Sequence, residues 1–163
     1  MHRRFFVLLI CGLAAFAPRS FAVAIGGNLL GAGVGPVNFS NTVIDFTTPV
    51  NPLGNGTGTF DILAGSTGSF AALAGANAAS IRDLNSATVP AGVPVAYSNF
   101  VTFAAQPTWS ITLTLLLPGS FSSAECGLPA AAGQVCTPAG SPFEFVNTTA
   151  TSSTVTFSFL GDA

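Results

Sequence analysis

Residues 109–117 read Trp-Ser-Ile-Thr-Leu-Thr-Leu-Leu-Leu, and this stretch decides the fold class. Apolar side chains alternate with hydroxyl side chains, and the apolar face holds Trp109, Ile111, Leu113 and Leu115. A period of two residues is typical of a β-strand with one buried and one exposed face. The stretch therefore predicts a half-buried strand.

The same alternation returns in residues 154–160, where Val155, Phe157 and Phe159 are predicted to point inward. Shorter candidate strands are bounded by Gly, Pro or Asn and cover residues 42–47, 57–63, 80–84, 95–103 and 143–147. Many short strands separated by turn residues indicate an all-β fold, namely a single antiparallel β-sandwich or jelly-roll-like domain. The apolar last strand must be paired. We expect it to be central in its sheet or the chain to continue beyond Ala163.

A short repeat links residues 57–65 (TGTFDILAG) to residues 67–75 (TGSFAALAG). Two copies are too few for a solenoid, so we interpret them as neighbouring strands joined by a turn. The Ala-rich residues 70–79 also permit one or two helical turns, although Gly75 and Asn77 weaken a helix there. That alternative stays open.

Residues 1–22 have the order of a secretory signal peptide. A basic start, His2 to Arg4, precedes an apolar run over residues 5–17, and small residues at Ser20 and Ala22 suit cleavage after Ala22. The apolar run is shorter than the roughly 20 residues that a membrane span needs. We therefore predict export, a single mature domain of residues 23–163, and no membrane span in it.

Charge is nearly absent after residue 22. Arg82 is the only basic residue there, against six carboxylates, and the chain has no Lys. Binding to nucleic acid or to an anionic membrane surface requires clustered Lys and Arg, so we exclude those partners. High apolar content argues against disorder. Little electrostatic repulsion opposes self-association, which is therefore one expected interaction.

Cys126 and Cys136 are the two cysteines that remain after cleavage, since Cys11 lies in the signal peptide. An even pair in an exported chain predicts a disulfide. A metal site would need further ligands that the surrounding sequence does not offer, and the spacing is not that of a CxxC redox site. We predict no metal and no cofactor.

Catalytic side chains are scarce. The only His is His2, so a Ser-His-Asp or Cys-His arrangement and a His-ligated metal are impossible in the mature chain. A glycosidase that uses only carboxylates would have Glu125 and Glu144 as its pair. Surface charge is the better interpretation of both residues. We therefore predict no catalytic residue and no enzymatic activity.

Aromatic residues suggest one binding alternative. Tyr97 and Trp109 are candidate glycan contacts, because aromatic rings stack on sugars, although Trp109 shares the apolar face of its strand and is expected in the core. Asn38, Asn55 and Asn147 each begin an Asn-X-Ser/Thr sequon, which matters only in a host that glycosylates such sites.

Three segments resemble secreted bacterial proteins of the PEP-CTERM class. They are residues 56–60 (GTGTF), residues 98–103 (SNFVTF), and Cys126 together with residues 134–143 (QVCTPAGSPF). The resemblance implies an exported all-β protein, sorted to the cell surface and associated with exopolysaccharide or biofilm matrix, with no catalytic residues. The sorting signal of that class, a Pro-Glu-Pro motif, a membrane helix and a basic cluster, does not occur before Ala163.

The sequence thus predicts a non-enzymatic secreted or cell-surface protein with a structural or exopolysaccharide-matrix role. The alternative is a carbohydrate-binding module. The expected partners are an extracellular polysaccharide or further copies of the chain.

Overall fold

The computed structural model describes residues 25–34, 37–46 and 56–163, so the predicted signal peptide lies outside the described residues. The fold is nearly all β and sandwich-like, with antiparallel sheets, as predicted. The largest sheet has six strands and curls into a half-barrel. Its strands, in spatial order, are β1 (Gly31–Gly33), β4 (Thr57–Ile62), β5 (Gly75–Arg82), β7 (Pro94–Phe103), β8 (Gln106–Leu116) and β12 (Phe159–Asp162).

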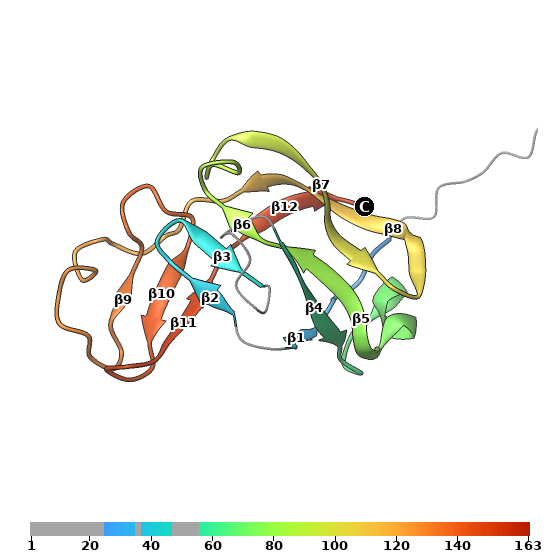
Figure 1. Ribbon diagram of the computed structural model, residues 1–163, viewed down its shortest axis with the longest axis horizontal. Helices are drawn as coiled ribbons and strands as arrows, with labels where there is room; N and C mark the ends of the chain where they lie inside the picture. The colour runs from blue at the N-terminus through green and yellow to red at the C-terminus, as the bar shows by residue number, and fades with distance from the viewer. Residues whose placement is uncertain (1–24, 35–36, 47–55) are drawn as a thin grey trace, which may run out of the picture.

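Two three-stranded sheets complete the described fold. One has the order β2 (Asn38–Phe39), β3 (Val43–Asp45) and β6 (Leu84–Asn85), and the other has the order β11 (Ser153–Thr156), β10 (Glu144–Asn147) and β9 (Val135–Cys136). Figure 1 shows the second of these at one end of the molecule, with β2 and β3 between it and the large sheet. No helix in the described part of the chain is long and apolar enough to cross a bilayer.

The deciding stretch forms β8 and pairs with β7 on one side and β12 on the other. Leu113 and Leu116 are fully buried although they lie three positions apart. The pairing with β12 explains this spacing, because Leu160 lies opposite Leu115 and Gly161 opposite Leu113, which leaves Thr114 as a bulge. A bulge moves the following side chains to the other face. The predicted apolar face is therefore correct as far as Leu113. Beyond the bulge, Leu116 is buried in place of the predicted Leu115.

The predicted strand over residues 154–160 is two strands. β11 belongs to the small sheet, and the chain then crosses to the large sheet, where β12 begins at Phe159. Val155, Phe157 and Phe159 all pack against the core, so the predicted inward face is confirmed. β12 is the outer strand of the described sheet and not a central one.

The repeat does not form two neighbouring strands. Its first copy is β4, but the second copy contains the 3₁₀ helix η1 (Gly68–Leu73), so that interpretation was wrong. Gly68 has φ +60°, and the Ser69 N–H donates to Gly26 O at 2.8 Å, which docks this copy on the chain before β1. Phe70 and Leu73 are buried. The open helical alternative is thus correct for its first residues, and β5 follows.

The remaining candidate strands occur where they were predicted, with changed limits. Residues 42–47 contain β3, residues 95–103 lie in β7, and residues 143–147 contain β10, while residues 80–84 are divided between β5 and β6. One core joins the sheets, since the fully buried side chains include Ile44, Leu84, Phe100, Leu113 and Phe143.

Asp83, between β5 and β6, binds the backbone of Phe46 and Gly56, the two residues that flank residues 47–55. It is 1% exposed. Its Oδ1 accepts the Phe46 N–H at 2.8 Å and its Oδ2 accepts the Gly56 N–H at 2.6 Å. A buried carboxylate is costly unless such bonds compensate it. Asp83 therefore fixes the two flanks relative to each other.

Candidate functional site

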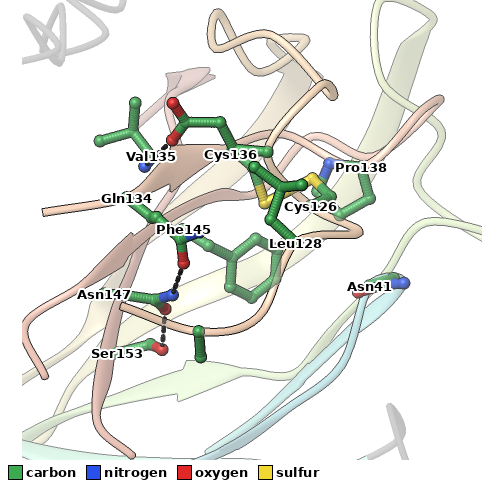
Figure 2. Close-up of a pocket in the computed structure, with 12 residues that line it drawn as sticks. Asn41, Cys126, Leu128, Gln134, Val135, Cys136, Pro138, Phe145, Asn147 and Ser153 are labelled. Atoms are coloured by element: carbon green, nitrogen blue, oxygen red, sulfur yellow. Dashed lines mark hydrogen bonds between the residues drawn. A yellow bond between two sulfur atoms is a disulfide. The ribbon is translucent and has the colours of Figure 1, made fainter. Parts of the chain in front are cut away.

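A pocket of about 200 Å³ lies where β9, β10 and β11 face the turn between β2 and β3. We call it the disulfide pocket, because Cys126 and Cys136 both line it. Figure 2 shows the Phe145 ring near its centre, Leu128 beside the ring, and Asn41 on the opposite side. The pocket thus combines apolar and uncharged polar side chains from segments distant in sequence.

The predicted disulfide is confirmed, with Cα atoms 5.3 Å apart. Cys136 ends β9, and Cys126 lies in the exposed loop that follows β8. The bond attaches this loop to the sheet, and the loop carries both Glu125 and Leu128 to the pocket. The covalent link therefore builds one wall of the site.

A chain of hydrogen bonds forms the opposite wall. Asn147 donates from Nδ2 to Gln134 Oε1 at 3.0 Å, and its Oδ1 accepts the Ser153 hydroxyl at 2.6 Å. Gln134 is itself fixed, since it accepts the Ala131 N–H at 2.8 Å and donates to Pro129 O at 2.9 Å. Ser153 lies opposite Asn147 in the register of β10 and β11. These polar groups are therefore held in one orientation.

Glu125 is the one ionisable side chain that lines the pocket in the described chain. Its Oε2 accepts the Val135 N–H at 3.1 Å, so the carboxylate is anchored to β9. No Lys or Arg lines the pocket. The site is therefore neutral apart from one negative charge.

Glu144, the other carboxylate of the predicted glycosidase pair, is not in the pocket. It precedes Phe145 in β10, and successive side chains of a strand point to opposite faces. Glu144 accepts hydrogen bonds from the Ser120 hydroxyl, from the Ser120 N–H at 2.7 Å, and from Thr156. These bonds hold the pKa of Glu144 below its ordinary value. An ionised carboxylate on the other face cannot act as the general acid for a sugar bound beside Glu125.

Tyr97, a predicted glycan contact, is occupied by structural interactions. Its hydroxyl donates to Asp83 O at 3.0 Å, and its ring packs beside Phe100. The Arg82 guanidinium lies over the ring, 3.9 Å from the centroid, and also donates to Ser98 O. Burial raises the pKa of Tyr97, with a further increase from Asp83, and Arg82 opposes both. One face of the ring is thus already covered.

Trp109, the second predicted glycan contact, is half-buried and packs against the core, as the strand pattern suggested. Tyr97 lies opposite Leu113, four residues from Trp109 along β8. At a rise of 3.2–3.4 Å per residue, Trp109 and Leu113 are about 13 Å apart along β8, so Trp109 lies well away from Tyr97 along the sheet. Neither residue lines the disulfide pocket.

A second depression, of about 340 Å³, lies around residues 118–123 and 137–141. Two of its three lining hydroxyls already serve the backbone, because Thr137 accepts the Phe121 N–H and Ser141 accepts the Phe143 N–H. The described residues also contain no group of three or more His, Cys, Asp or Glu side chains that could hold a metal ion. The disulfide pocket is therefore the better candidate.

Sequence reasoning missed most residues of this pocket. Gln134, Phe145, Asn147 and Ser153 carry no motif that marks a binding site, and Asn147 attracted attention only as a sequon. Gln134 does fall in the Cys136 block on which the family resemblance rests. That block and the cysteine pair were the sequence features that could have indicated the position of the pocket.

Comparisons with known proteins do not identify the pocket. No known protein family, curated protein or solved structure matches this chain. The chemistry of the site therefore has to be inferred from its own residues.

Proposed function

We propose that this chain is a non-catalytic, exported protein of the cell surface or extracellular matrix, associated with exopolysaccharide, which acts by binding. The disulfide pocket carries the proposal, because it gathers uncharged hydrogen-bonding groups around an aromatic ring and contains no acid–base pair. Pockets with a few convergent polar groups among apolar walls are the usual form of a small-molecule site.

The predicted signal peptide supports the location. The disulfide also supports it, since disulfides persist in oxidising compartments and are rare in the cytosol. His and Lys, the usual general bases beside carboxylates, are missing from residues 23–163. No cofactor is proposed.

Sedimentation with insoluble polysaccharides tests the binding role. The protein is incubated with neutral glucans and with purified biofilm matrix, and we expect it to pellet with at least one of them. A parallel panel of hydrolase substrates should show no turnover. Measurable turnover, or a protein that stays in the supernatant with every polysaccharide, would overturn the proposal.

Self-association is the second candidate, supported by the exposed outer edge of β12, where Leu160 is 55% exposed. Exposed strand edges pair readily with further strands. Sedimentation velocity at rising protein concentration tests it. A sedimentation coefficient that does not change would rule out this role.

A further inference from the structure

The side chains of the disulfide pocket retain unused hydrogen-bonding capacity. Asn147 uses one of its two amide hydrogens on Gln134, and Ser153 donates its hydrogen to Asn147, which leaves the oxygen lone pairs available. Within the described chain, the Asn41 side chain makes no hydrogen bond, although it lines the pocket. The pocket thus offers donors from the side-chain amides of Asn147 and Asn41. It offers acceptors from the Ser153 hydroxyl and from the Glu125 carboxylate. Sugar hydroxyls both donate and accept, so they fit this mixture.

An apolar surface lies next to these polar groups. The half-buried Phe145 ring, Leu128 and the disulfide form it, and Leu128 is 56% exposed at the rim. A second ring, Phe39 of β2, lies with its centroid 5.7 Å from that of Phe145 and supports it. A pyranose presents one face of C–H groups bordered by hydroxyls, which matches an apolar wall beside amides.

Size and charge restrict the ligand further. The volume of about 200 Å³ is below the roughly 300–1,000 Å³ of sites for drug-sized molecules, so one sugar ring fits better than a longer segment. Glu125 repels carboxylate, sulfate and phosphate groups, and no cation lines the pocket to attract them. We therefore propose that the disulfide pocket binds one uncharged pyranose residue of a polysaccharide and excludes acidic sugars. This inference rests on the proposed polysaccharide-binding function.

Titration followed by NMR is the direct test. The isotopically labelled protein is titrated with methyl glucoside, methyl galactoside and methyl glucuronide, and the side-chain amide signals of Gln134, Asn147 and Asn41 are recorded. We expect at least one neutral glycoside to shift these signals with an affinity at least tenfold higher than that of the glucuronide. Shifts that avoid these amides, no shift with either neutral glycoside, or equal affinity for the glucuronide would overturn the inference.

Two variants and a matched control sharpen the test. Ser153→Ala removes one acceptor from the pocket and should weaken neutral glycoside binding about fivefold to tenfold, as for one lost hydrogen bond. Ser158→Ala, at an exposed position between β11 and β12, is the matched control and should bind as the wild type does. Glu125→Gln keeps an oxygen for the Val135 N–H but removes the charge, so it should bring glucuronide affinity to within about threefold of the neutral glycoside. Equal binding by both serine variants would contradict the site.

The sedimentation assay separates this inference from the proposed function. If Ser153→Ala loses glycoside binding and pelleting together, both are supported. If it loses neither while the wild type pellets, the pocket assignment fails and the matrix role stands. If the wild type never pellets but the neutral glycoside still shifts the pocket amides, the matrix role fails and the pocket assignment stands.

Discussion

The large sheet and the disulfide lobe (residues 118–156) are stabilised by different interactions. The sheet relies on apolar packing, with Phe100, Leu113 and Leu116 fully buried. Much of the lobe is exposed, and a disulfide and side-chain hydrogen bonds hold its loops to β9 and β10. The stability of the sheet therefore depends on its apolar core. The stability of the lobe depends instead on whether the disulfide is oxidised and on individual polar residues. The proposed binding site, the disulfide pocket, lies in this lobe.

The largest effect should come from the sheet. Phe100 is 0% exposed, and its ring lies edge-on to Phe159 with centroids 5.0 Å apart. Phe100→Ala should lower the free energy of unfolding by about 3–5 kcal/mol, as is usual for Phe→Ala in a core. Urea denaturation followed by circular dichroism measures the change, with the exposed Leu63→Ala as control. A loss below 1 kcal/mol would contradict the packing described for β7.

Removing the disulfide tests the lobe. The double variant Cys126→Ser, Cys136→Ser frees a crosslink over a sequence separation of 10, which in the chain-entropy model costs about 3 kcal/mol. We expect hydrogen exchange to increase at β9 and β10 more than at β7 and β8. Uniform acceleration over both regions would show that the lobe and the sheet unfold as one unit, which would contradict a separate stabilisation of the lobe.

Asp83 tests the junction between the sheets. Asp83→Asn replaces one of the two carboxylate oxygens that accept a backbone N–H with an amide donor, so one part-buried N–H loses its partner, which costs about 1–3 kcal/mol. Thermal unfolding measures the loss, and Asp162→Asn, at the exposed end of β12, is the control. Equal melting temperatures for the two variants would contradict the role assigned to Asp83.

The smallest effect concerns pH. The pKa of Glu144 is lowered in the folded state, so the carboxylate contributes stability above its ordinary pKa, and this contribution disappears as the pH falls through the folded value. Glu144→Gln should therefore melt about 1 °C below the wild type at pH 7, and the two should converge as the pH falls through the folded pKa of Glu144. Thermal melts from pH 7 to pH 3 provide the measurement. A difference that persists at the acid end would assign the effect to packing instead.

The two regions also differ in how far sequence predicts them. Alternation placed β8 closely, because burial of one strand face imposes a period on the residues, and bounding turn residues placed β4 and β7. The bulge at Thr114 and the crossing between β11 and β12 were not predicted, since both depend on pairing with a distant strand. The second repeat copy folded differently because its contacts with Gly26 and Asn28, through Ser69 and Thr67, outweigh local similarity.

The candidate site was predictable only at its covalent link. The even cysteine pair in an exported chain predicted the disulfide, but the hydrogen bonds of Gln134, Asn147 and Ser153 join residues whose individual types are common in loops and turns. The register between β10 and β11 places Asn147 opposite Ser153. This register cannot be predicted from a local sequence pattern. Tyr97 and Trp109 were chosen by residue type alone, and the structure packs both against the core.

Arg82 gives the protein a built-in reporter of unfolding. Beyond residue 19 it is the only Lys or Arg in the chain, so trypsin has one bond to cut there, the bond to Asp83. That bond joins an arginine packed on the Tyr97 ring to a buried aspartate, and the protease cannot engage it until the sheet opens. A single pair of fragments appearing over time would therefore measure the opening of the large sheet, without any label or probe.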